Sequence, residues 1–129
     1  MKGVMMDAAD VVSLIVGDTN VVSYLVGNLW ARYDFYDRLA EIFHNDARAV
    51  VEGLRARART LAPSAKAGPA LNLFDVEMAI DQDLHLGSTP DETASTLLAL
   101  ADFIERHHRT ISSYYDAKAG DVARRLGIL

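Results

Sequence analysis

The feature that most restricts the fold of this chain is a long helical pattern in its last third. The pattern begins at Thr89-Pro90, where Thr89 suits the N-cap, Pro90 the first helical position and Glu92 the third position of a capping box. Apolar side chains then recur at helical spacing on one stripe, at Leu97, Ala101, Ile104, Ile111 and Tyr115. Because such a stripe must be covered by other helices, we expect an all-α fold.

Two further segments of the sequence also predict helices. Residues 29–61 carry their apolar side chains mainly on one side, and residues 63–69 form an evident proline- and glycine-containing loop. A helix over residues 71–86 follows, and a short tail over residues 121–129 closes the chain. Together with the N-terminal segment these elements predict a four-helix antiparallel bundle, folded as a single helical domain over residues 1–129.

The N-terminal segment, residues 11–26, admits two interpretations. The sequence of residues 11–17 (VVSLIVG) returns almost unchanged at residues 21–27 (VVSYLVG), with Asp-Thr-Asn between the copies. Valine-rich runs around a turn are typical of a β-hairpin, whereas Asp7 and Asp10 suit a helix N-terminus, and we favour a broken helix. Since the segment is apolar nearly all round, it must be buried in the core or against a second subunit, which predicts a homo-oligomer.

Composition excludes several classes of protein. The 129 residues include no cysteine, so disulfides, thiolate metal sites and cysteine nucleophiles are ruled out. A net charge of −5 argues against a nucleic-acid partner. Because acidic residues interrupt the apolar N-terminal run, no signal peptide or membrane-spanning helix fits, and we expect a cytoplasmic protein with no membrane partner.

Charge is unevenly distributed along the chain. Residues 71–102 carry seven carboxylates and no lysine or arginine, whereas residues 48–66 carry four arginines and one lysine against the single carboxylate of Glu52. Arginines near a helix C-terminus favour the helix dipole, which explains the basic stretch without a ligand. The acidic segment alternatively faces a cation or a protein partner.

Two Glu-x-x-His tetrads, Glu41–His44 and Glu105–His108, lie in segments that read as helix. At this spacing a glutamate and a histidine share one helical face and can hold one metal ion together. Glu77 falls on the apolar stripe of the third expected helix, so its carboxylate should point inward and needs a partner. With no cysteine present, histidine and carboxylate ligands suit iron, manganese or zinc better than copper(I).

The order of these residues resembles that of ferritin-like di-iron carboxylate four-helix proteins. The resemblance implies a dinuclear iron or manganese centre, for oxygen or peroxide chemistry or for iron handling. It covers most of the chain in layout but rests on few residues, because the first helix contains no glutamate. Asp10 precedes Glu41 by about as many residues as Glu77 precedes Glu105, so Asp10 is the candidate to replace the missing glutamate of the first helix. Asp18 is the other candidate for this role.

Three readings compete with a dinuclear centre. Glu77, Asp81 and His85 are spaced for a smaller single-metal site on one helix. His44, followed by Asn45-Asp46, resembles the phosphoaccepting histidine of a phosphotransfer module. In the third reading the protein is a non-catalytic interaction or adaptor module, whose acidic 71–102 face and apolar N-terminus meet other chains.

Overall fold

A computed structural model describes residues 6–25 and 28–128 of the chain. These residues form six helices: α1 (Ala8–Val16), α2 (Val22–Leu25), α3 (Leu29–Asn45), α4 (Ala47–Leu61), α5 (Leu73–Ile80) and α6 (Pro90–Leu126). The expected all-α class is confirmed, since the described residues contain no strand. None of their helices is both long enough and apolar enough to cross a membrane.

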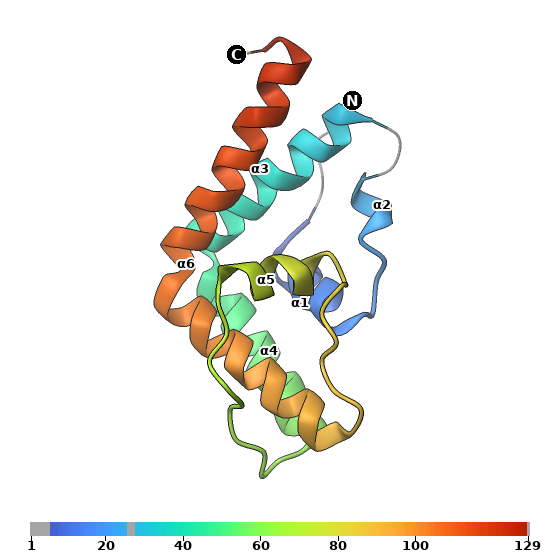
Figure 1. Cartoon of the computed structure of the whole chain (residues 1–129), viewed down its shortest axis with the longest axis vertical. Helices are drawn as coiled ribbons and strands as arrows, with labels where there is room; N and C mark the ends of the chain where they lie inside the picture. The colour runs from blue at the N-terminus through green and yellow to red at the C-terminus, as the bar shows by residue number, and fades with distance from the viewer. Residues whose placement is uncertain (1–5, 26–27, 129) are drawn as a thin grey trace.

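The architecture is built on two long helical paths that run antiparallel (Figure 1). One path is α3 followed by α4, with a break at Asp46, and the other is α6, with a kink at His107. As Figure 1 shows, α3 lies beside the C-terminal part of α6 and α4 beside its N-terminal part. The two short helices α1 and α5 pack against this frame, α1 on α4 and α5 on α1 and α6.

Aromatic and branched apolar side chains fill the core between these helices. Phe35, Phe43 and Tyr115 are each at most 1% exposed, and Phe43 stacks on Tyr115 with ring centroids 6.2 Å apart. Val11 and Leu14 of α1 are fully buried in the same core. The first valine-rich copy is therefore covered within this chain, and the predicted homo-oligomer does not need it.

The sequence predicts where the helices begin more accurately than where they end. The capping box at Thr89, Pro90 and Glu92 is present, and a second box at Asp7 and Asp10 begins α1. Residues 29–61 divide at Asp46, whose φ of −126° and ψ of 21° interrupt the helix. The third helix ends at Ile80 instead of residue 86, and residues 121–126 continue α6 instead of forming a tail.

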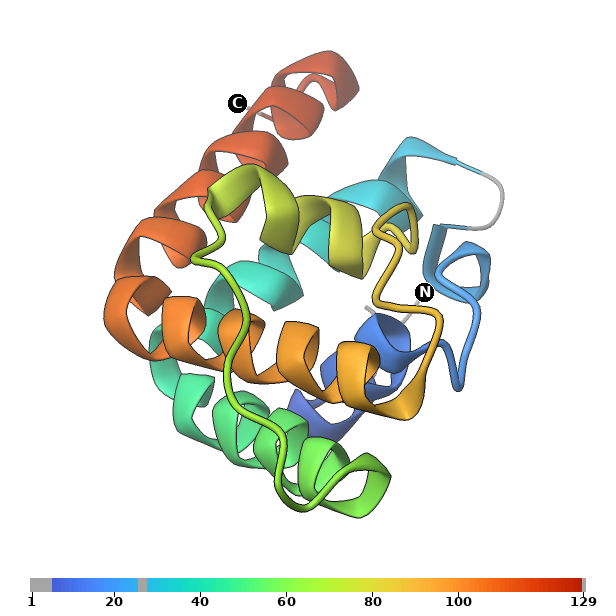
Figure 2. The ribbon, with the colours of Figure 1, turned by 60° about the horizontal axis from the view of Figure 1, so that its bottom comes forward.

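The described residues of the 11–26 segment are helical, with a break between α1 and α2. Gly17 ends α1 with a φ of 83°, in the left-handed region that favours glycine. Residue 26 lies outside the described residues. The segment that joins α4 to α5 passes over α6 in Figure 2, where the Gly68 amide donates to the Ser95 carbonyl at 3.0 Å.

Gln82 ends α5 and holds the turn between α1 and α2 in place. Its φ of 64° is unusual for a residue other than glycine. The Gln82 Nε2 donates to the carbonyls of Leu14 (3.0 Å) and Thr19 (2.5 Å), and its Oε1 accepts from the Val21 amide (3.1 Å). These three bonds offset the backbone conformation and connect two elements more than sixty residues apart.

We expect Gln82→Ala to lower the free energy of unfolding by about 1–2 kcal/mol, because three hydrogen bonds disappear while the positive φ stays. Gln82→Gly loses the same bonds but removes the steric cost, so it should be more stable than Gln82→Ala by up to about 1 kcal/mol. Urea denaturation of both variants measures the difference. Equal stability of both variants and the unsubstituted protein would show that these bonds contribute nothing.

Candidate functional site

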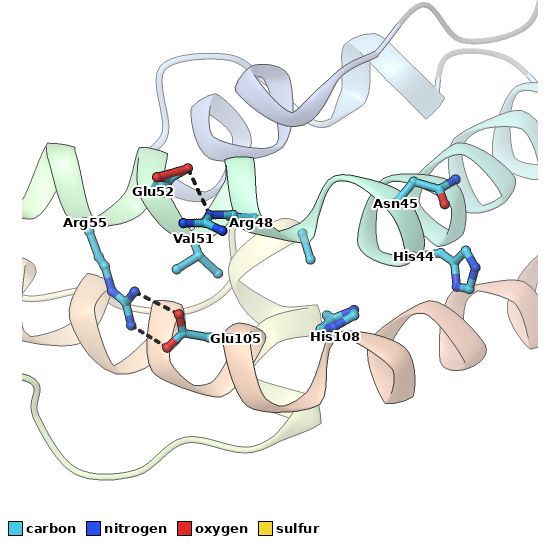
Figure 3. Close-up of a pocket in the computed structure, with 9 residues that line it drawn as sticks. His44, Asn45, Arg48, Val51, Glu52, Arg55, Glu105 and His108 are labelled. Carbon is cyan, nitrogen blue, oxygen red and sulfur yellow. Dashed lines mark hydrogen bonds and ion pairs between the residues drawn. The ribbon is translucent and has the colours of Figure 1, made fainter.

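Three of the six predicted metal ligands line one pocket, where α3 meets α4 and both face α6 (Figure 3). We call it the junction pocket. It has a volume of about 460 Å³ and is lined by His44, Asn45, Ala47, Arg48, Val51, Glu52, Arg55, Glu105 and His108. The structure therefore brings residues of both Glu-x-x-His tetrads, His44, Glu105 and His108, to one place.

The junction pocket lies where both long helical paths deviate from helical geometry. The break at Asp46 separates α3 from α4, and the kink in α6 falls at His107, whose φ is −129° and ψ 24°. His108 Nδ1 lies 3.1 Å from the Phe43 carbonyl oxygen, beside the break. Because a carbonyl only accepts, Nδ1 carries the proton of this bond, which leaves Nε2 as the nitrogen of neutral His108 available to a ligand.

Glu105 is held by an arginine from the opposite helix. Arg55 of α4 donates to both oxygens of the Glu105 carboxylate, at 2.9 and 3.1 Å, and to Asp102 Oδ1 at 3.0 Å. The pKa of Glu105 is lowered, first by the hydrogen bonds from Arg55 and then by the positive charge of Arg55. The pKa of Arg55 is raised by its hydrogen bonds to Glu105 and Asp102. Figure 3 shows the carboxylate turned toward Arg55, so metal binding through Glu105 requires it to leave this ion pair.

The first tetrad is at the surface. Glu41 is exposed and forms an ion pair with Arg38, three residues earlier on α3. His44 is also exposed and lines the junction pocket from α3. An exposed imidazole is accessible to a metal and to a phosphoryl donor alike, so the position of His44 does not distinguish between these ligands.

Glu77 points inward, as its stripe predicted, but on another side of α6. Its Oε2 accepts from the Tyr114 hydroxyl and from Lys118 Nζ, both at 2.5 Å. Burial works to raise the pKa of Glu77, but the hydrogen bonds from Lys118 and Tyr114 and the charge of Lys118 lower it overall. The partner that the sequence required for this carboxylate is therefore present within the chain.

The remaining predicted ligands lie apart from the junction pocket. Asp10 belongs to the capping box of α1, where its carboxylate accepts from the Asp7 amide at 2.9 Å. His85 is not on the same helix as Glu77, because α5 ends at Ile80, and its Nε2 lies 3.3 Å from Ser88 Oγ. Across residues 6–25 and 28–128, no three His, Asp or Glu side chains come together as a metal-binding group.

Sequence reasoning missed the residues that pair with the candidate ligands. Lys118 and Arg55 belong to no motif, and their roles depend on which helix faces which. The apolar stripe predicts Tyr115 as a packing residue, and its ring is buried, but its hydroxyl has no hydrogen-bond partner among the described residues. Burial, followed by the charge of Asp81, raises the pKa of Tyr115.

Comparison of this chain with protein-family models, with curated proteins and with solved structures finds no match.

Proposed function

We propose that this protein is a non-catalytic interaction module that binds another protein through its surface. The observation that supports the proposal most is the exposure of Trp30, the single tryptophan of the chain, whose surface is 48% accessible. Its ring lies edge-on to Tyr33, with centroids 6.5 Å apart, at the beginning of α3. Large amphipathic rings of this kind commonly anchor protein interfaces.

The charges support a smaller acidic face than the sequence predicted. Four of the seven carboxylates in residues 71–102 have intramolecular roles: Asp75 and Glu92 in capping boxes, Glu77 and Asp102 in ion pairs. Asp83 and Asp91 are exposed, and Asp81 is half-buried. We therefore place the partner at the aromatic end of α3 and not across the whole acidic segment.

The proposal is tested with a photo-crosslinking residue in place of Trp30, in the full chain produced in its native host cells. We expect a discrete covalent adduct after irradiation, whose mass distinguishes a second copy from another protein. The control carries the same residue in place of Arg59, which is exposed on α4. Absence of any adduct, or equal adducts from both positions, would contradict an interface at Trp30.

A second candidate function is metal binding, favoured by one observation: His44, Glu105 and His108 line the same pocket. In this structure their carboxylate is already paired and Glu77 lies elsewhere, so the residues do not fit a ready-made dinuclear iron or manganese centre. Metal binding here would use the His108 Nε2 and the His44 imidazole first, because neither gives up an ion pair.

Elemental analysis after anaerobic reloading with ferrous iron tests this second candidate. About two metal ions per chain, absent from a His44→Ala/His108→Ala double variant, would support the dinuclear centre. Retention of one ion by that variant would move the site to other residues. No bound metal would leave the interaction module as the function.

A further inference from the structure

The α3–α6 pair has two long edges, and no described helix covers one of them. On one edge α5 packs on α6, and Glu77 reaches Tyr114 and Lys118 of α6. The other edge, which we call the open seam, contains two adjoining hollows of about 220 and 350 Å³. Asp37 and Asp116 line both hollows, so the two form one groove along the helices.

Negative charge in the open seam is not balanced within the described part of the chain. Asp37 of α3 and Asp116 of α6 are both exposed, and neither forms an ion pair or a side-chain hydrogen bond with the described residues. The pKa of Asp37 is raised, first because the walls of the groove remove water from its carboxylate, then because of the charges of Asp116 and Asp34. A cationic side chain placed between these carboxylates would relieve their repulsion.

Gly120 lines the open seam without being required by the fold. It lies inside α6 in helical conformation, where glycine is about 0.5–1 kcal/mol less favourable than alanine. Among the described residues outside its own helix backbone, a Cβ atom at this position would meet only Arg124 Nη1, at an ordinary 3.9 Å. Together with Ala40, Ala119 and Ala123 it gives the groove a floor of small side chains, on which the backbone of another helix can approach closely.

One end of the groove is apolar. Tyr33 and Ile128 line it from the two chain segments, and Ile128 is 45% exposed. Trp30, which is exposed, lies beside the half-buried Tyr33, so this aromatic pair continues the same surface. An apolar side chain of a partner has a contact here, one helical turn from Asp37.

We propose that the open seam binds a basic amphipathic helix of another protein, with arginine or lysine side chains between Asp37 and Asp116 and an apolar side chain at Tyr33 and Ile128. This inference rests on the proposed interaction function and adds the place and chemistry of the partner. The lining of α3 extends from Tyr33 to Asn45, or about 18 Å at 1.5 Å per residue, which is a little more than three helical turns. A partner helix bound in the open seam would form a three-helix arrangement together with α3 and α6.

The probe for this site is a fluorescein-labelled Ala/Gln helix of about 16 residues, with leucine near each end and two arginines between them on the same face. Leucine at both ends allows either direction of binding. We expect the full chain to bind this peptide in fluorescence anisotropy, and binding to weaken as salt is raised. A peptide with glutamate in place of both arginines is the matched control, and it should not bind.

Three variants of the full chain locate the binding. Asp37→Asn/Asp116→Asn should weaken the peptide complex at least about tenfold, since both charges in contact with the arginines are lost. Asp83→Asn/Asp91→Asn removes the same charge elsewhere and should leave affinity unchanged. Gly120→Gln should block the groove sterically while keeping the helix, whereas Gly120→Ala should bind nearly as the unsubstituted chain does.

Several outcomes would overturn the inference. These are equal binding of the glutamate peptide, unchanged affinity in Asp37→Asn/Asp116→Asn, or no binding of the arginine peptide. A concentration-dependent dimer abolished by Gly120→Gln would instead assign the seam to a second copy of this chain. Crosslinked adducts at Trp30 that persist in Gly120→Gln would place the partner outside the seam and leave the proposed interaction function standing. Absence of any adduct when Gly120 is unchanged would instead reject the function itself.

Discussion

Replacement of Lys118 by Met should lower the free energy of unfolding by about 2–4 kcal/mol at neutral pH. The Lys118 ammonium lies 2.5 Å from Glu77 Oε2, and the side chains of this pair are only 29% and 16% exposed. Removal of the cation leaves the Glu77 carboxylate largely buried, and within the described part of the chain the Tyr114 hydroxyl is then its only donor. The ammonium also lies over the rings of Tyr36 and Tyr114, 4.9 and 5.4 Å from their centroids. Methionine keeps a side chain of similar length but loses these cation–π contacts, which adds to the expected loss.

The loss of stability in Lys118→Met should depend on pH, in a direction that follows from the pKa shifts of the two paired groups. The lowered pKa of Glu77 means that its stabilising contribution is present above the ordinary value of 4.5 and is lost as pH falls through the folded-state pKa. Lys118 is the reverse case: burial lowers its pKa, but the hydrogen bond to Glu77 and the nearby charges raise it overall. Its contribution is present below 10.5 and is lost as pH rises through the folded-state pKa.

Chemical denaturation from acid to alkaline pH measures this prediction. The difference between the unsubstituted protein and Lys118→Met should be largest between the two ordinary pKa values and smaller beyond them. The double variant Glu77→Gln/Lys118→Met should recover part of the loss, because no buried charge is left unpaired. Arg124→Met, which removes an exposed ion pair with Asp121, is the matched surface control and should change stability by less than about 1 kcal/mol. An equal loss in both single variants would contradict a special role of the buried pair.

The sequence predicts those features of the fold that depend on interactions within about one helical turn. Capping chemistry and apolar spacing placed the start of α6 correctly, because an N-cap depends on residues within one helical turn. The end of α5 was missed because it depends on Gln82, whose side chain reaches the turn between α1 and α2. The break at Asp46 could not be predicted, because the sequence around it contains no proline or glycine. The break lies beside the hydrogen bond between His108 and the Phe43 carbonyl, which joins residues far apart in the sequence.

For the candidate metal ligands, too, the sequence predicts local features but not contacts between distant residues. Helical spacing predicted correctly that Glu77 points inward, but it carries no information on which side chain lies opposite. Glu105 and Arg55 are fifty residues apart, and their pairing follows only from the antiparallel contact of α4 with α6. A buried or half-buried carboxylate needs a partner, and an arginine or lysine meets that need as well as a metal does. The sequence therefore identified groups that require partners better than it identified the partners.

Substitution of Gly53 by Gln should destabilise the protein by about 3 kcal/mol, although the same substitution at Gly120 should not destabilise it. Both glycines lie inside helices, Gly53 in α4 and Gly120 in α6. A Cβ atom at Gly53 would lie 2.7 Å from Val12 Cγ2 of α1, closer than real contacts allow. Because valine is stiff at its first torsion angle, α1 itself must move to admit the new side chain.

Thermal and urea unfolding of five variants, one of them Val12→Ala alone, distinguishes a glycine that internal packing requires from one that it does not require. Gly53→Ala should be less damaging than Gly53→Gln, since its gain in helix propensity of about 1 kcal/mol partly offsets the clash. Val12→Ala combined with Gly53→Ala should remove the clash, so that the two substitutions are non-additive. Gly120→Gln should leave the melting temperature unchanged or raise it, because a side chain there extends into the open seam. If Gly120→Gln instead destabilises the fold, the glycine serves internal packing, and it no longer supports a helix-binding role for the seam.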